Sequence, residues 1–340
     1  MICKHSYVGP TQRYLVAEVE LPESHQTAIR FVLESSKRHS DASKVQKTRW
    51  ERWRKISLWL VVFGSFLATL GGAMATEGAA KGSTDWGQVF AAIGGVLLAA
   101  VGSISTYMLS PSKSQAWVRL RAVAESLKSN SYRFAAVTPP FDGEDAPEQL
   151  INLAREQQKA VDVSPIGEVD KKKLDERLPA IPIAPNDYIQ ARVDNQISWY
   201  RDRAGKFRNL HNKWRWRSFG FALLGAAAGA LHPYLGLASW VALSGTITGA
   251  IGSFLHAGRF DFLILTYSGT ATELEGLKAL YQSNQAKETA GAFKKFVQDC
   301  EDVMSREHKA WLAEWTRDKT DGKDPGADEP VGDDNDNTDA

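Results

Sequence analysis

Histidine and cysteine residues are the first candidates for chemistry in this chain, and their spacing argues against it. Cys3 and Cys300 lie far apart in the sequence, a pattern typical of neither a disulfide framework nor a zinc site. His232 and His256 flank an uncharged segment, where they fit either an interfacial position or a pH-sensitive gate. The local motifs of serine hydrolases, zinc proteases, thiol redox enzymes and P-loop NTPases do not occur. We therefore expect no catalysis and no bound metal or cofactor.

Small residues recur every four positions in the apolar segments of the chain. They are Ala91, Gly95, Ala99, Ser103, Gly225, Gly229, Gly245, Gly249 and Ser253. This interval places small side chains on one face of a helix and lets helices approach closely in lipid. The pattern therefore indicates packing within a helical hairpin, association between copies of the chain, or both.

The same apolar segments carry hydroxyl groups but no Asp, Glu, Lys or Arg. A selectivity filter of charged rings is therefore excluded within them. If the chain forms a pore, hydroxyls or a hydrophobic gate must line it, and hydrogen bonding between helices is the alternative role for the hydroxyls. The candidate lining residues are Ser103, Ser105, Thr106, Ser244, Thr246, Thr248 and Ser253.

Long segments without charged residues identify the helices that must position these side chains. Residues 218–257 carry no formal charge, and as a helix they would measure about 60 Å, twice the roughly 30 Å of a bilayer core. Pro233 and Gly236 in the middle predict a tight turn that ends one helix and begins another. Two further uncharged stretches lie upstream. The sequence therefore predicts four transmembrane helices at about 56–75, 88–109, 218–234 and 237–257.

Basic and aromatic residues gather on one side of both predicted hairpins. Between residues 37 and 55, and again between 201 and 217, Lys and Arg are dense, whereas the two hairpin loops hold only Lys81. The positive-inside rule then places both termini in the cytoplasm. Residues that adjoin the spans fit the headgroup region, where amphipathic rings are favoured. These predicted anchors are Trp50, Trp53, Arg54, Lys55, Trp214, Arg215, Trp216 and Arg217.

Composition divides the chain into five parts. A net charge of +1 over 340 residues argues against general nucleic-acid binding, and a mean hydropathy of −0.31 indicates a protein only partly embedded in a membrane. The predicted fold class is an all-α membrane protein with two transmembrane hairpins and cytosolic helical extensions that form a bundle. The expected parts are an N-terminal segment (1–22), a first two-helix membrane unit (23–138), a Pro-rich linker (139–186), a second such unit (187–316) and an acidic, disordered tail (317–340).

Repeated patterns relate the two units. A Glu-x-Leu-Lys element begins at Glu125 and again at Glu275, at a similar distance beyond each hairpin, which indicates a duplication. Apolar stripes at helical spacing over 189–207 and 293–315 predict two amphipathic helices that pack together, with Cys300 as a core residue. We also expect the last transmembrane helix to continue without a break from Ala257 to Tyr267.

The stretch leading into the second hairpin resembles the SLATT group, the SMODS- and SLOG-associating two-transmembrane effector domains. The matching positions are Tyr188, Arg192, Gln196, Trp199, Tyr200, Ala204, Glu301, Glu307 and Trp311. The first unit is similar to another SLATT subtype. The resemblance implies a bacterial inner-membrane effector of nucleotide-centred conflict systems that breaches the membrane without chemistry. Since the chain carries no nucleotidyltransferase and no SLOG-type sensor, a partner must supply the trigger.

Two functions follow from these observations. The first is an effector that oligomerises into a pore, because four helices in one chain are too few to enclose a roomy conduit. The alternative is a membrane-anchored scaffold whose bundle recruits a signalling partner. The expected partners are the lipid bilayer, further copies of the chain and a sensor or nucleotide-signalling protein, but no nucleic acid. A constitutive carrier is less favoured, since polar groups near the membrane midplane are not evident.

Overall fold

The computed structural model describes residues 23–75, 86–159, 161, 169–176, 178–284 and 289–316, and every regular element in these ranges is helical. The elements are α1 (Glu23–Ala75), α2 (Trp86–Tyr107), α3 (Pro111–Ala135), α4 (Ala146–Lys159), α5 (Lys171–Asp175), α6 (Pro185–Tyr188), the π-helix η1 (Ile189–Asp194), α7 (Asn195–Leu235), α8 (Ala238–Ala257), α9 (Phe260–Ser283) and α10 (Ala290–Thr316). The predicted all-α fold class is therefore confirmed. The predictions for 1–22 and for the acidic tail from 317 lie outside the described residues.

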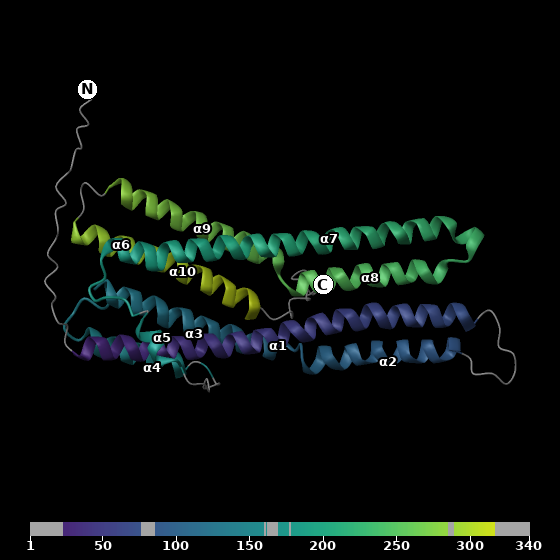
Figure 1. Cartoon of the computed structure of the whole chain (residues 1–340), viewed down its shortest axis with the longest axis horizontal. Coiled ribbons are helices and arrows are strands. Elements are labelled where there is room, and N and C mark those ends of the chain that lie inside the picture. The colour runs from purple at the N-terminus through teal and green to yellow at the C-terminus, as the bar shows by residue number, and fades with distance from the viewer. Residues whose placement is uncertain are drawn as a thin grey trace, which may run out of the picture.

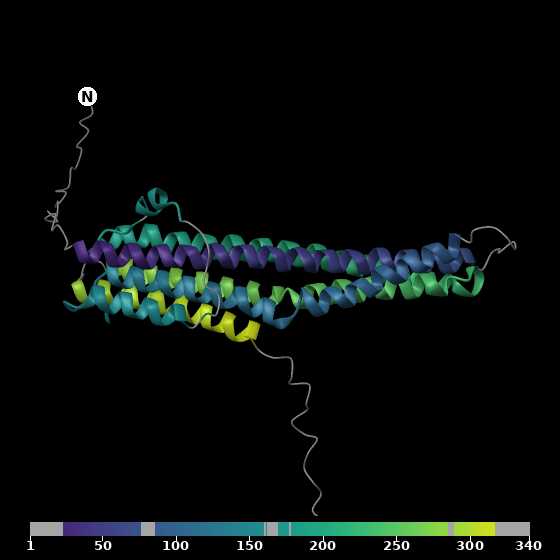
Figure 2. The same cartoon turned by 90° about the horizontal axis from the view of Figure 1, so that it is seen from below.

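The molecule is elongated, and the two longest helices, α1 and α7, run along most of it (Figure 1). At one end, α2 and α8 pair with the last parts of α1 and α7 as two hairpins; we call this end the membrane half. It comprises residues 56–75, α2, 218–235 and α8. At the other end, α3, α4, α9 and α10 pack along the first parts of α1 and α7, as Figures 1 and 2 both show. We call this end the helical bundle.

Four helices in the described part of the chain are long and apolar enough to cross a bilayer, and they contain the four predicted spans. The predicted end of the second span at 109 is two residues too late, because α2 ends at Tyr107. The turn in the second hairpin also differs from the prediction. Helix α7 continues through Pro233 to Leu235, and Gly236, with φ of 65°, closes it by donating its N–H to the carbonyl of His232. In the last turn the proline ring removes only one ladder hydrogen bond, so the left-handed glycine ends the helix.

The four spans make their main contacts in the order α7, α8, α1, α2, which is also their order across Figure 1. Leu58 of α1 packs against Leu243, Ile247 and Ile251 of α8, and this contact joins the hairpins. Only 6% of the apolar windows of α2 and α7 is buried, against 22% for α1 and α8. The spans therefore form an open row and leave most of the two outer helices uncovered.

Both hairpins leave the membrane half through a break. Helix α8 ends at Ala257, Arg259 adopts a left-handed conformation with φ of 48°, and α9 begins at Phe260. The prediction of a continuous helix from Ala257 to Tyr267 is therefore wrong. The first hairpin has a similar break, because three residues separate the end of α2 at Tyr107 from Pro111, which opens α3. Proline at the first helical position favours a new helix there.

The segment interpreted as a linker contributes to the core of the bundle. Its helix α4 buries Ala146, Leu150 and Ala154, which recur every four residues and form one apolar stripe. The chain then returns to the core at Ile183, whose N–H donates to the carbonyl of Ala135 over 2.8 Å. The surrounding prolines and charges mask this stripe in the sequence, so the linker interpretation is wrong for these residues.

The two predicted apolar stripes do pack together. Side chains of η1 and α7 share one hydrophobic core with those of α10, and Cys300 is fully buried within it. Burial and the neighbouring Glu301 raise the pKa of the Cys300 thiol above its usual value. A protonated, enclosed thiol is inert, which confirms Cys300 as a core residue.

Candidate functional site

Glycines bring α1 and α2 into close contact, although the two closest ones, Gly71 and Gly94, lie outside the four-residue repeat. A Cβ added at Gly94 would lie 2.6 Å from the backbone nitrogen of Ala68, and one added at Gly71 would lie 2.4 Å from that of Ala91. Ala91 thus belongs to this contact as predicted. Gly95, in contrast, has no heavy atom within 4 Å of such a Cβ. The register of the hairpin selects Gly94 as the contact residue and turns Gly95 outward.

The predicted small residues of the second hairpin divide into two groups. Gly225 faces Ser244, since an added Cβ would lie 2.8 Å from the Cβ of that serine, and Gly229 lies near Val241. Gly245 and Gly249 have open space where a Cβ would be. Among the other predicted positions, the exposed ones are Ala99, Ser103 and Ser253. Association between copies of the chain through the open positions stays a prediction.

The hydroxyls proposed as pore lining have mixed surroundings. Thr106 donates to the carbonyl of Gly102 and Thr246 to that of Ala242, each over 3.0 Å within its own helix. Ser105 is exposed, Ser244 packs under Gly225, and the buried hydroxyl of Thr248 has no hydrogen-bond partner among the described residues. Local back-bonding thus accounts for two of them, and a lining role stays a prediction for all.

One predicted membrane anchor lies in the core instead. Trp50 is only 8% exposed, and its ring centroid lies 5.5 Å from that of Trp315 and 6.5 Å from that of Trp117. The prediction is wrong because α3 and α10 fold back onto this turn of α1. At the start of the second hairpin, Trp216 is 73% exposed, whereas Trp214 packs on Phe254. The remaining predicted anchors are partly or fully exposed at Trp53, Lys55, Arg215 and Arg217.

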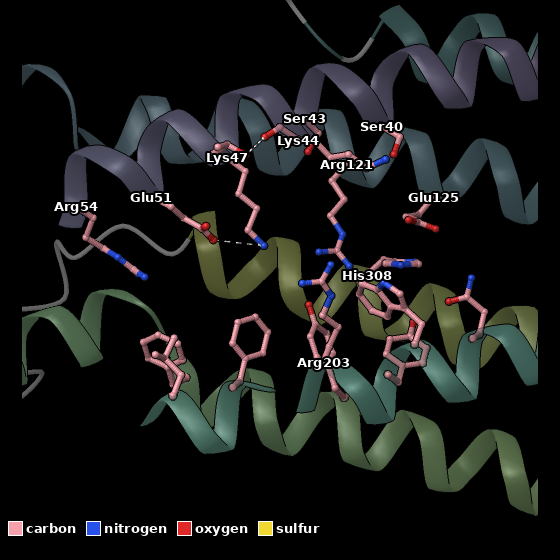
Figure 3. Close-up of a pocket in the computed structure, with 18 of the residues that line it drawn as sticks. Ser40, Ser43, Lys44, Lys47, Glu51, Arg54, Arg121, Glu125, Arg203 and His308 are labelled. Carbon is pink, nitrogen blue, oxygen red and sulfur yellow. Dashed lines mark hydrogen bonds and ion pairs between the residues drawn. The ribbon is translucent and has the colours of Figure 1, made fainter. Parts of the chain in front are cut away.

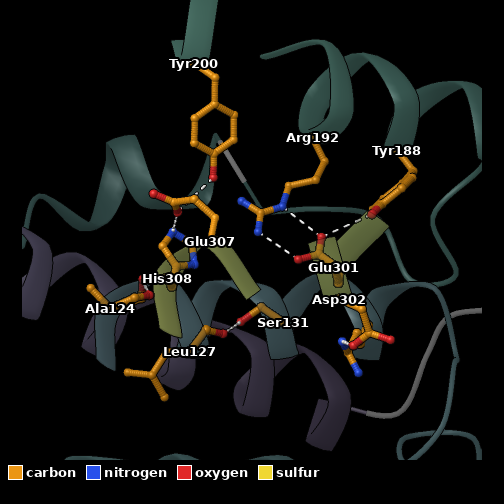
Figure 4. A network of polar contacts seen from close by, with 12 residues as sticks. Ala124, Leu127, Ser131, Tyr188, Arg192, Tyr200, Glu301, Asp302, Glu307 and His308 are labelled. Atoms are coloured by element: carbon orange, nitrogen blue, oxygen red, sulfur yellow. Dashed lines mark hydrogen bonds and ion pairs between the residues drawn. The ribbon is translucent and has the colours of Figure 1, made fainter. Parts of the chain in front are cut away.

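A buried polar network crosses the bundle (Figure 4). Two guanidinium nitrogens of Arg192 donate to the two carboxylate oxygens of Glu301, each over 2.8 Å, and the hydroxyl of Tyr188 donates to the same carboxylate over 3.1 Å. Arg192 and Glu301 are 1% and 0% exposed. Burial alone would lower the pKa of Arg192, but the pairing with Glu301 outweighs burial and raises it. The pair is therefore charged and closed to solvent.

The π-helix η1 carries Arg192 into this network, and the arginine also reaches the first unit. Its guanidinium lies over the ring of Tyr132 in α3 at 4.9 Å. Nearly two helical turns further along α10, the hydroxyl of Tyr200 donates to Glu307 over 3.2 Å, and His308 lies 3.1 Å from the same carboxylate. Several of the residues that carry the family resemblance thus meet in polar contacts, and Arg192 among them also packs against the first unit.

A polar pocket of about 620 Å³ lies where α1 and α3 face α7 across the bundle (Figure 3). Seven cationic side chains line it and only two carboxylates, those of Glu51 and Glu125. The cations are Lys44, Lys47, Arg54, Lys55, Arg121, Lys128 and Arg203. Both units supply them. The sequence suggested only a membrane-side role for several of these residues, because the pocket forms between helices that are far apart in the chain.

Burial and the excess positive charge shift the pKa values of ionisable groups in the pocket. Partial burial and the nearby Arg121 lower the pKa of Lys47 to about 8, and burial lowers that of Arg54 to about 10. Burial alone would raise the pKa of Glu125, but the surrounding cationic groups, His308 and Lys128 first among them, lower it to about 2. The pocket therefore holds more positive charge than its own carboxylates neutralise.

Aromatic rings support the guanidinium groups of the pocket. Arg121 lies over the rings of Trp199 at 5.3 Å and Trp311 at 4.7 Å, and Arg203 also lies over Trp199, at 5.6 Å. Arg54 lies 4.6 Å from the ring centre of Phe254. Stacking on rings fixes the guanidinium planes without neutralising their charge. Within the described ranges, no cluster of three or more His, Cys, Asp or Glu side chains is suited to a metal ion.

Comparison with known families bears on both units. Residues 188–311 match the family model of the SMODS and SLOG-associating 2TM effector domain 1, and this range contains the whole Arg192–Glu301 network. Residues 39–149 match that of a protein family of unknown function, DUF4231, so the likeness of the first unit to another SLATT subtype stays a prediction. No curated protein and no solved structure matches the chain. The chain is thus a membrane protein with four helices able to span a bilayer, and its residues 188–311 belong to the SLATT family of two-transmembrane effector domains.

Proposed function

We propose that this protein is an effector of a bacterial conflict system that oligomerises in the inner membrane into a pore, with both termini in the cytoplasm. A partner protein in a nucleotide-signalled pathway supplies the trigger. The observation that carries the proposal is the division of α8 into two faces. Leu243, Ile247 and Ile251 pack toward α1, whereas Gly245 and Gly249 leave open space on the other side.

Such a face suits association in lipid. Apolar surface alone does not drive helices together in a bilayer, because lipid tails are equally apolar, whereas small residues allow close van der Waals packing. The open row of spans adds to the argument, since four helices in a row enclose nothing within one chain. Several copies that associate through α8 would turn open rows into the wall of a conduit.

The distribution of basic residues supports the proposed orientation. The turns of α1 and α7 that precede the spans carry Arg52, Lys55, Arg215 and Arg217, all exposed. An excess of exposed cations on one side of both hairpins favours the cytoplasmic side for the bundle.

The test is leakage of potassium and of a small dye from cells after a short induction together with the genomic partners. We expect leakage with the wild type and its loss in Gly245→Leu/Gly249→Leu at equal membrane abundance, because the added side chains block close approach. Ala222→Leu/Ala226→Leu is the matched control, since it introduces the same side chain at exposed positions of α7. Absence of leakage from the wild type under these conditions would contradict the proposal.

A membrane-anchored scaffold is the second candidate, favoured by the concentration of the packed core outside the membrane half. In that case the hairpins serve only as anchors. Replacing both hairpins with an unrelated membrane anchor separates the two functions: a scaffold keeps its cellular activity after the exchange, and a pore-forming protein loses it.

A further inference from the structure

The charge imbalance of the pocket between the two units has no use in the packing of the bundle. Lys47, Arg54 and Arg121 come from the first unit and Arg203 comes from the second, and all of them face one cavity. We propose that this pocket binds a small anion with two or more phosphate groups, which bridges α1 and α3 to α7. Binding of the anion does not depend on whether the chain forms a pore.

The guanidinium groups are arranged to receive phosphate. Arg54, Arg121 and Arg203 each lie over an aromatic ring, at 4.6 to 5.6 Å from its centre, and a ring leaves their charge available to a ligand. Within the described ranges, no carboxylate lies within 4 Å of the guanidinium nitrogens of Arg54, Arg121 or Arg203, and the buried Nε of Arg54 has no hydrogen-bond partner. Phosphate oxygens match the planar fork of arginine in a bidentate manner.

The carboxylates of the pocket are too few to balance these cations. Glu51 lies 3.8 Å from Lys47, and Glu125 faces His308, Lys128 and Arg121. A single negative charge would still leave a surplus of cations, so the charge of the ligand must be two or more. A volume of about 620 Å³ falls within the range of ordinary ligand sites and exceeds what one inorganic phosphate needs.

Two sources can supply such an anion, and the position of the pocket admits both. The end of the pocket near the membrane half lies at Arg54 and Lys55, directly before the first span, where the phosphate of an anionic lipid headgroup can enter. The opposite end lies in the bundle beside Glu125 and His308, where a free polyphosphate compound can enter from solvent. In either case the ligand neutralises the repulsion between cations of the two units and joins them.

The experiment uses the full chain purified in a neutral detergent and confirmed as folded by circular dichroism. Titration calorimetry with inorganic triphosphate measures binding to the wild type, Arg203→Gln, Arg121→Gln and the control Arg208→Gln. Arg203 is exposed enough for its substitution to leave the fold intact, and Arg208 lies outside the pocket on the same helix. Native mass spectrometry of the same proteins, after passage through nanodiscs of phosphatidylcholine with or without cardiolipin, whose headgroup carries two phosphates, measures the retained anionic lipid.

If the source is a free polyphosphate, triphosphate binds the wild type, Arg203→Gln weakens binding by about tenfold or more, and Arg208→Gln leaves it unchanged. If the source is a lipid headgroup, the wild type and Arg208→Gln retain cardiolipin and Arg203→Gln loses it. The proposal is overturned if the folded wild type binds neither probe, or if binding is the same in Arg203→Gln as in the wild type. If Arg121→Gln fails to fold, the result with Arg203→Gln alone decides whether the proposal holds.

Discussion

The helical bundle and the membrane half are held together by different interactions. In the bundle, aromatic rings, an enclosed ion pair and the apolar faces of α3, α4, α9 and α10 form one continuous core. In the membrane half, each helix contacts mainly its neighbours in the row, and the two outer spans are almost uncovered. Water drives apolar side chains together in the bundle, whereas lipid offers no such force to the spans.

This difference assigns different tasks to the two ends. The two units contact each other mainly in the bundle, where the guanidinium of Arg192 lies over the ring of Tyr132 and α3 packs against α10. In the membrane half, the main contact between the hairpins is that of α1 with α8, so the bundle sets how the hairpins lie relative to each other. The open face of α8 is left for a second molecule.

The largest loss of stability is expected when the buried ion pair of the bundle is removed. Glu301→Ala leaves Arg192 charged and enclosed without its partner, which should lower the free energy of unfolding by about 3–5 kcal/mol. Its neighbour Asp302 pairs with Arg133 at the surface and is 63% exposed, so Asp302→Ala should cost less than about 1 kcal/mol. Denaturant unfolding in detergent, followed by tryptophan fluorescence, measures both. Similar losses for the two variants would show that the network does not stabilise the bundle.

A smaller effect is expected in the membrane half, where two adjacent glycines provide a matched pair. Gly94→Leu places atoms within 3 Å of the backbone of α1 and should lower stability by about 1–3 kcal/mol, because backbone cannot move aside as a side chain can. Gly95→Leu enters open space and should change stability by less than about 0.5 kcal/mol. The midpoint of thermal unfolding in detergent compares them. A reversed order would mean that α1 and α2 pack in a different register.

The same glycines show what the sequence can predict. Where the structure has a helix end, the predicted end of the span lies within about two residues of it, because the absence of charge over helical length is a local property. Which of two adjacent glycines faces α1 depends on the rotation of one helix against another, and spacing alone does not fix it. The four-residue repeat therefore contains Gly95 and not Gly94, the glycine that faces α1.

Long-range packing explains the other differences. Trp50 and Trp216 have the same basic surroundings in the sequence, yet α3 and α10 cover the first and nothing covers the second. The pocket has the same origin, since Lys47 and Arg203 meet only when the two units pack. The family resemblance, in contrast, identified Arg192, Glu301 and Tyr188 without showing that they form one buried network.

The smallest effect concerns the charge surplus of the pocket in the bundle. Lys47 faces Glu51 and Arg54 of its own helix, Arg121 and the ring of Trp117 in α3, and Arg203 in α7. Its pKa of about 8 in the folded chain lies below the ordinary lysine value of about 10.4, which we assume for the unfolded chain. Between these two values the unfolded chain binds more protons, so folding stability increases as the pH rises. Lys47 is partly exposed, and solvent screening reduces the effect to roughly 1 kcal/mol.

From pH 7.5 to 9.5, the free energy of unfolding of the wild type should therefore rise relative to Lys47→Met, measured without added anion. Lys44→Met is the control, because Lys44 is more exposed and should give a curve parallel to that of the wild type. Parallel curves for both variants would mean that the positive charge of Lys47 carries no free-energy cost in the empty pocket.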